Sequence, residues 1–191
     1  GTTSQFGWKQ IVASASGVGV AAVSPNSTDD GPHHVSLYNV GDPATTDAFL
    51  TTFETPGLAS AVTLYGGLAF VADSQAGLQA LLYRPFDTGG VAPTLALEPG
   101  FDPTAVEEGQ WTRVRALATD DGELRDVTFF LDGRRLVEDG TYPYEVRFRA
   151  PSLDRQSIFR IEARARDTGG NVTWSPPLFG LLRSEEHTSE L

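Results

Sequence analysis

Apolar and polar residues alternate along short runs through most of the chain, and clusters of Gly, Pro, Asn and Asp separate these runs. A two-residue period places the apolar side chains on one face of a β-strand. No segment carries the 3.6-residue period of an amphipathic helix over a convincing length. The pattern therefore predicts an all-β protein.

The clearest alternation lies between residues 91 and 182. The hairpin signal Asp132-Gly133 follows one of its runs, and arginines fill the outward positions of two others. The positions predicted to face a common core are Val114, Ala116, Ala118, Val127, Phe129, Leu131, Tyr144, Val146, Phe148, Phe159, Ile161, Ala163 and Ala165. Short strands with frequent turns over this length predict an antiparallel sandwich of two sheets.

Three motifs in this part resemble those of bacterial immunoglobulin-like domains. They are Ala118–Gly133 (ATDDGELRDVTFFLDG), Pro143-Tyr144 and Ile161–Asn171 (IEARARDTGGN). The resemblance covers about residues 92–182 and implies an Ig-like or fibronectin-like β-sandwich. Because this fold carries many unrelated functions, the resemblance does not identify a ligand.

Residues 1–90 contain a loose internal repeat. The run from Gly67 to Pro85 has an earlier counterpart between Gly19 and Pro43, at an offset typical of β-propeller blades. The later copy resembles the LVIVD-type repeat of bacterial surface β-propellers at Gly66, Gly67, Ala69, Val71, Ala72, Asp73, Gly77 and Leu78. The resemblance covers about residues 11–86 and implies a partial β-propeller of about two blades.

A turn-rich link, Asp87–Pro93, divides the chain, with few charged residues before it and many after it. We expect residues 1–90 to be a propeller-repeat fragment and residues 91–182 to be the Ig-like domain. Residues 183–191 (RSEEHTSEL) match the translation of a sequencing-library adaptor, so we exclude them from the expected fold. We therefore expect the chain to be a piece of a longer protein.

The charge of the chain narrows the classes of partner. Asp and Glu number 25 against 14 Lys and Arg, for a net charge of -11, which would repel the phosphate backbone of nucleic acid. No apolar run reaches the length of about 18 residues that a membrane-spanning helix needs. The sequence contains no cysteine, which excludes disulfides and cysteine-ligated zinc.

Acidic loops supply one candidate metal site. The sandwich would bring Asp120 and Asp121 to the same end as Asp167 and Asn171. Carboxylate and amide oxygens are ligands that Ca²⁺ prefers, and Ca²⁺ is the only cofactor that the sequence suggests. The alternative is that these side chains cap turns through local hydrogen bonds.

Two tryptophans supply a candidate ligand-binding surface. Trp111 and Trp174 could be exposed platforms for sugar rings, as in carbohydrate-binding sandwiches. The alternative is that each ring packs under a loop at the start of its strand.

No catalytic residue is predicted. The chain lacks a Gly-x-Ser-x-Gly elbow and a glycine-rich phosphate loop, and Glu107-Glu108 and Glu138-Asp139 fall where the pattern predicts turns. We expect a non-catalytic fragment of a secreted or cell-surface modular bacterial protein, serving structural spacing, adhesion or protein and ligand binding. Its partners would be other domains of the parent chain, a cell-surface protein or a glycan. The alternative is a pair of accessory domains, linker or carbohydrate-binding, of a large extracellular hydrolase.

Overall fold

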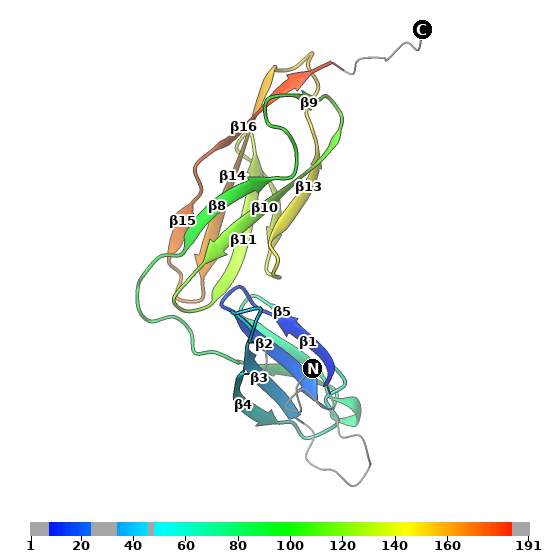
Figure 1. Ribbon diagram of the computed structural model, residues 1–191, viewed down its shortest axis with the longest axis vertical. Helices are drawn as coiled ribbons and strands as arrows, with labels where there is room; N and C mark the ends of the chain where they lie inside the picture. The colour runs from blue at the N-terminus through cyan, green and yellow to red at the C-terminus, as the bar shows by residue number, and fades with distance from the viewer. Residues whose placement is uncertain (1–7, 24–33, 46–47, 185–191) are drawn as a thin grey trace.

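The computed structural model describes residues 8–23, 34–45 and 48–184, which fold almost entirely into β-strands. A short 3₁₀ turn, η2 (Ser74–Ala76), is the only helical element among these residues. None of the described residues forms a helix long and apolar enough to cross a membrane. The all-β prediction is confirmed, and Figure 1 shows the chain as two parts placed end to end.

The N-terminal part consists of two antiparallel meanders. Within each sheet the strands pair in chain order. The first sheet contains β1 (Trp8–Ala13), β2 (Val18–Val23), β3 (His34–Asn39) and β4 (Ala48–Glu54), and the second contains β5 (Ala61–Tyr65), β6 (Leu68–Ala72) and β7 (Leu78–Leu81). The two copies of the predicted repeat fall on β2 with β3 and on β6 with β7.

The two small sheets share one core. Val20 and Val35 of the first sheet are buried in the same cluster as Val62 and Val71 of the second. The backbone N–H of Val62 also donates to the Gln10 side chain at 3.0 Å, which links β5 to β1. The two meanders therefore form one packed unit, and their identity as propeller blades stays a prediction.

The C-terminal part is a sandwich of two sheets. One sheet has the order β13-β10-β8 and the other the order β12-β11-β14-β16-β9, with β15 paired to β14. All pairs are antiparallel except β16 with β9, which is parallel. The strands are β8 (Thr94–Pro99), β9 (Val106–Glu107), β10 (Trp111–Thr119), β11 (Leu124–Leu131), β12 (Arg134–Asp139), β13 (Glu145–Arg149), β14 (Ile158–Asp167), β15 (Val172–Trp174) and β16 (Leu178–Arg183).

The predicted alternation produces the sandwich core. Every residue predicted to face the core is buried except Leu131, which lies half-buried against it. The rings of Phe148 and Phe159 meet edge to face across the two sheets at 5.9 Å. The prediction of a two-sheet, mainly antiparallel sandwich is confirmed.

Three of the four carboxylates for which the sequence predicted turns lie in strands. Glu107 ends β9, and its side chain pairs with Arg183 at 2.6 Å. Glu138 and Asp139 end β12, where Thr128 of β11 pairs with Glu138. The prediction of turns was therefore wrong at Glu107, Glu138 and Asp139, because strand pairing overrides a locally polar sequence. It was right at Glu108, which lies in a turn.

The last strand extends one residue beyond the predicted end of the sandwich. Arg183, which we assigned to the adaptor-like tail, closes β16 and pairs in parallel register with Glu107. Residues 185–191 lie outside the described part of the chain. The foreign origin of residues 183–191 stays a prediction.

The two parts of the molecule meet at the hairpin between β5 and β6 (Figure 1). The backbone N–H of Gly66 donates to the carbonyl of Gly140 at 3.1 Å, and the Thr141 hydroxyl donates to the carbonyl of Leu64 at 3.3 Å. Gly67 lies so close to Thr168 that an added Cβ would be 2.6 Å from its methyl group. The hairpin tip is therefore seated directly against the sandwich.

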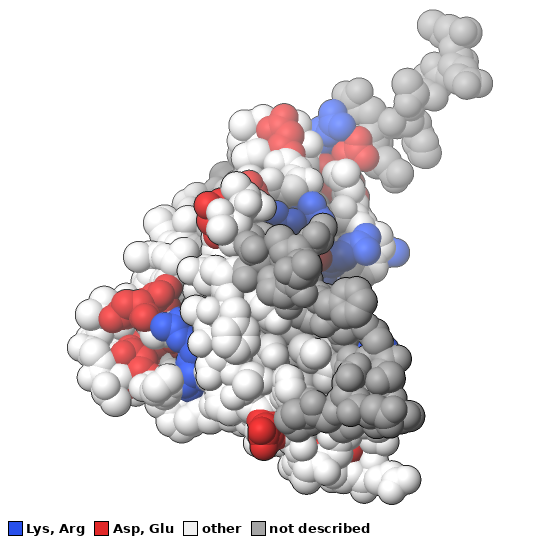
Figure 2. Space-filling model, turned by 60° about the horizontal axis from the view of Figure 1, so that its bottom comes forward, with Lys and Arg blue, Asp and Glu red and all other residues white. Residues whose placement is uncertain are grey.

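Further contacts on the sandwich side of the junction involve the turn before β11. The Ser16 hydroxyl donates to the buried carboxylate of Glu123 at 2.6 Å. The Arg84 guanidinium donates to the carbonyl of Gly122 at 2.8 Å. On the face shown in Figure 2, small groups of charged residues are separated by broad uncharged areas. Polar side chains therefore join the two parts at the turn before β11.

Candidate calcium site at the junction

An acidic cluster lies at the end of the sandwich that faces the N-terminal part. Asp120 and Asp121 lie in the turn between β10 and β11, while Asp167 ends β14 and Asn171 precedes β15. The structure brings these two predicted loops to the same end of the sandwich. It also adds Asp87, which lies in the segment between β7 and β8.

Three carboxylates of this cluster, without Asp167, are close enough to share one cation. Asp87, Asp120 and Asp121 each offer an oxygen, and these oxygens lie within 4.8 Å of one another. The Asn171 amide donates to Asp167 at 2.9 Å and reaches Asp87 at 3.5 Å. Asn171 therefore connects the loop between β14 and β15 to the link between the parts.

Local turns use some of the same oxygens. Asp87 accepts the backbone N–H of Gly89 at 2.6 Å, and Asp120 accepts that of Gly122 at 3.0 Å. Asp167 accepts the backbone N–H of Asn171 at 2.8 Å. These are the hydrogen bonds of the turn-capping alternative, which therefore holds for one oxygen of Asp87, one of Asp120 and both of Asp167.

One oxygen of Asp120 has no hydrogen-bond partner among the described residues. This atom, Oδ1, is shielded from solvent, and buried polar atoms are ordinarily satisfied. Burial raises the pKa of the Asp120 carboxyl, and the negative charges of Asp167, Asp121 and Asp87 raise it further. A bound cation would give Oδ1 a partner and offset this repulsion.

The ligand set suits Ca²⁺ better than a transition metal, because it consists of oxygens without histidine or cysteine. Three carboxylates fill only part of the six to eight positions that Ca²⁺ takes, so carbonyls or water would complete the shell. The nearby Arg84 guanidinium contacts the carbonyls of Asp121 and Gly122. Because Arg84 bonds to these backbone carbonyls, it does not occupy the carboxylate oxygens that would bind a cation.

The two predicted ligand-binding tryptophans lie in different sheets of the sandwich. Trp111 begins β10 and Trp174 ends β15, and their exposed fractions are 57% and 52%. Arg149 lies over the Trp111 ring at 5.3 Å, and Phe130 lies 5.1 Å from the Trp174 ring. Because they belong to opposite sheets, these rings do not form one flat platform.

The carboxylate pairs considered for catalysis have structural partners. Glu108 accepts hydrogen bonds from the Ser152 hydroxyl and the Leu153 backbone. Asp139 accepts the backbone N–H groups of Thr141 and Glu145. These hydrogen bonds give Glu108 and Asp139 a structural role in holding their turns.

Sequence reasoning missed Asp87 and Glu123, which both lie at the junction. Asp87 carries a weak signal, because an Asp two residues before a Gly is typical of a capped turn. Glu123 carries none, because its interactions with the Ser16 hydroxyl and the Arg84 charge come from the other part of the chain.

Comparisons with known proteins bear mainly on the sandwich. Residues 93–159 match the family described as "Bacterial Ig domain". A solved structure of fibronectin(III)-like modules of Clostridium thermocellum CbhA is 17% identical, with a TM-score of 0.42, over 47% of this chain and 94% of that one. The sequence matches no curated protein. Residues 93–159 therefore belong to a bacterial immunoglobulin-like domain.

Proposed function

We propose that this chain is a non-catalytic part of a secreted or cell-surface modular bacterial protein, in which the Ig-like domain is a rigid spacer. The observation that carries the proposal is the seating of the β5–β6 hairpin on the sandwich through Gly66 and Gly140. A spacer must keep its neighbour at a fixed angle, and direct backbone bonding between two parts restricts that angle. The Ig-like family match supports the assignment to a modular bacterial protein.

The N-terminal part is proposed to be a fragment of an LVIVD-type β-propeller. A propeller blade is a four-stranded antiparallel meander, which is the arrangement of β1 to β4. The strands β5 to β7 repeat the first three strands of that order, and the two sheets share a core as neighbouring blades do. These features support the proposal.

The rigid-spacer proposal can be tested by distance measurements between spin labels. The natural sequence contains no cysteine, so Thr51→Cys and Arg155→Cys would supply the only two labelling sites, one in each part. We expect one narrow distance distribution by double electron–electron resonance. Labels at Leu117→Cys and Arg155→Cys, both within the sandwich, give the width due to the labels alone. A much broader distribution across the junction would reject the rigid spacer.

We further propose that the acidic cluster binds Ca²⁺ and strengthens the junction. Asp87 belongs to the link, whereas Asp120 and Asp121 belong to the sandwich, so one shared ion would hold the link against the domain. The unpartnered oxygen of Asp120 supports this proposal.

Thermal unfolding with added CaCl₂ or with EDTA tests the calcium proposal. An ion that binds only the folded state adds about 2.7 kcal/mol at a hundredfold excess over its Kd, so the Tm should rise by several degrees. Asp121→Asn should abolish this response. Asp102→Asn is the control, because it alters an exposed Asp that caps a turn through Thr104. A Tm that ignores Ca²⁺ would contradict the proposal.

An accessory role in a large extracellular hydrolase is the second candidate, and the exposure of Trp111 and Trp174 favours it. Exposed aromatic rings can stack on the apolar faces of sugars. Binding on a glycan array that is lost in Trp174→Ala would support this candidate. Retention of all binding in that variant would contradict a role for Trp174.

A further inference from the structure

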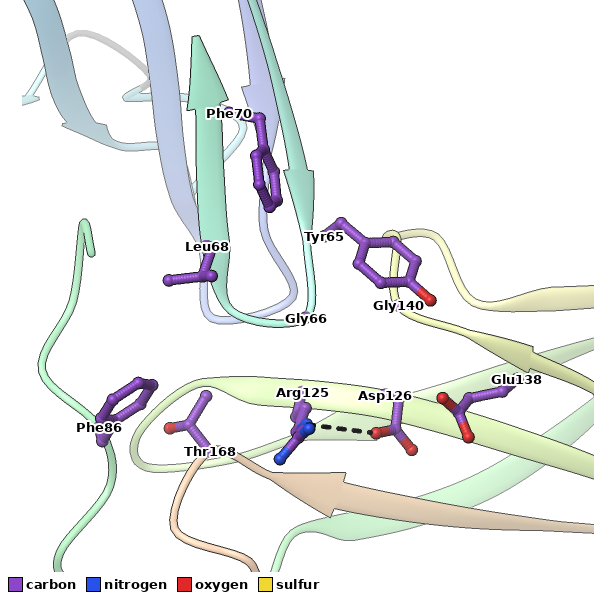
Figure 3. A pocket seen from close by; sticks show the side chains of 10 residues that line it. All are labelled: Tyr65, Gly66, Leu68, Phe70, Phe86, Arg125, Asp126, Glu138, Gly140 and Thr168. Carbon is purple, nitrogen blue, oxygen red and sulfur yellow. Dashed lines mark ion pairs between the residues drawn. The ribbon is translucent and has the colours of Figure 1, made fainter. Parts of the chain in front are cut away.

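A cleft of about 510 Å³ lies between the β5–β6 hairpin and the outer face of the sandwich. Figure 3 shows side chains from both parts lining it, with Tyr65 and Leu68 above and Asp126 and Glu138 below. Its volume falls within the range of about 300–1,000 Å³ that is typical of small-molecule sites. The cleft is separate from the acidic cluster, because it shares none of that cluster's aspartates.

The N-terminal part contributes the apolar side of the cleft. Tyr65 lies at the hairpin tip and Phe86 just before the link, and their exposed fractions are 52% and 53%. Figure 3 shows Phe86 at the Thr168 end of the cleft and Tyr65 near the Glu138 end. Exposed rings on two sides of one cleft offer flat apolar surfaces to a ligand.

The sandwich contributes the polar side, where Asp126 has an unused acceptor. Asp126 is only 3% exposed, and its Oδ1 has no hydrogen-bond partner among the described residues. The other oxygen, Oδ2, accepts Arg166 Nε at 3.0 Å. An ionised carboxylate accepts but cannot donate, so the missing partner is a donor such as a hydroxyl group.

The charges around the cleft balance locally. Arg125 and Arg166 both lie beside the Asp126 carboxylate, and Arg135 pairs with Glu138 at 3.0 Å. A charged ligand would have to displace these ion pairs, whereas a neutral one would not. The site therefore favours a neutral ligand that can both donate and accept hydrogen bonds.

We propose that this cleft binds a neutral sugar, with a C–H face of the ring against Phe86 or Tyr65 and a hydroxyl group donating to Asp126. A pyranose combines an apolar face with an edge of hydroxyl groups, which matches the two sides of the cleft. Arg125 and Glu138 supply the donor and the acceptor for further hydroxyls. The inference shares its ligand class with the accessory-domain candidate, but it rests on a different site.

Isothermal titration of the whole chain with cellotetraose, xylotetraose, mannotetraose and maltotetraose tests this proposal. We expect at least one of them to bind and Phe86→Ala to weaken that binding about tenfold, through the loss of one stacking ring. Phe179→Ala is the matched control, because Phe179 is also 53% exposed but lies on β16 at the far end of the sandwich. It should leave the affinity unchanged.

Two further variants separate this site from the tryptophans. Asp126→Asn should weaken sugar binding with little change in side-chain shape, and the Tm of the variant reports any loss of folding through the Arg166 pair. Trp174→Ala should leave the affinity unchanged. Absence of binding to all four sugars, or binding that depends on Trp174 and not on Phe86, would overturn the inference.

Discussion

The strands β2 and β10 show how the two parts of the molecule differ. Residues of β10 alternate between buried and exposed, whereas the first five residues of β2 are all buried. Alternation is typical of a sheet with one face in water, and continuous burial is typical of a strand covered on both faces. The sandwich therefore completes its own core with two sheets, while the N-terminal part is built for close stacking of small sheets.

The surfaces of the two parts also differ, because the sandwich is covered with paired charges and the N-terminal part exposes apolar residues at its edge. Charged residues on the sandwich pair across neighbouring strands, as Arg113 with Glu145 and Arg115 with Glu98 do. The N-terminal part instead exposes Phe49 and Leu50 on its edge strand β4. An exposed apolar edge is a surface that tends to pair with another chain.

Expressing the two parts separately should give the largest difference between them, in their tendency to aggregate. We predict that residues 1–90 expressed alone aggregate, because β4 and the uncovered junction are both exposed. Residues 91–184, which include the whole of β16, should remain monomeric, because their core is complete. Size-exclusion chromatography with light scattering measures both. A monodisperse product from residues 1–90 would contradict the view that only the N-terminal part exposes an aggregation-prone surface.

Within the whole chain, Phe129→Ala should remove about 3–5 kcal/mol from the free energy of unfolding of the sandwich, because Phe129 is fully buried in its core. Phe179→Ala, the same change at an exposed ring, should cost less than about 0.5 kcal/mol. Urea denaturation gives the free energies. Hydrogen exchange then shows whether β2 and β6 lose protection together with the sandwich, as they would if the two parts unfold as one unit.

At the junction, Gly67→Ala should cost about 1–3 kcal/mol. Gly67 has a φ of +82°, and its new Cβ would also meet Thr168. Gly66→Ala is the control, because Gly66 has a φ of +61° but open space around the added Cβ. The difference between the two Tm shifts measures the docking contact alone. Equal shifts would mean that the hairpin is not seated on the sandwich in solution.

The smallest effect should be the contribution of Glu123 to the pH dependence of folding stability. Burial raises the pKa of this carboxyl, although hydrogen bonds from Ser16 and Tyr83 and the Arg84 charge partly oppose the shift. The folded state therefore prefers the protonated form. Stability from this group is present at acid pH and is lost as the pH rises from the ordinary glutamate pKa through the raised one.

Glu123→Gln should remove that dependence. The variant should gain stability relative to the natural protein as the pH rises through this window, with no further gain above it. Denaturation curves at several pH values provide the measurement, and Glu98→Gln on the surface controls for the change in net charge. A difference in stability that stays constant across the window would contradict the prediction.

The sandwich could be predicted from the sequence because its information is local. Alternation at Val114, Ala116 and Ala118 gives the inward face of β10, whatever lies elsewhere in the chain. The turns at Glu107 and Glu138 were predicted wrongly, because pairing with β16 and β11 decided their structure. Strands held by distant partners carry little signal in their own residues.

Only some residues of the candidate sites could be predicted from the sequence, for the same reason. Asp120, Asp121, Asp167 and Asn171 could be grouped because a sandwich brings alternate loops to one end. Asp87 joins them, and Tyr65 approaches Glu138, only through the way in which the two parts pack. Two-residue periodicity contains no information about that packing.

The parallel pairing of β16 with β9 has a mechanical consequence. The chain enters the sandwich at the end next to the N-terminal part and leaves it at the opposite end (Figure 1). Tension along the chain would therefore pull Leu178–Arg183 lengthwise past Val106–Glu107. Hydrogen bonds that lie across the direction of pull, such as that from Glu108 N–H to the Arg183 carbonyl at 3.1 Å, share a shearing load and do not open one at a time.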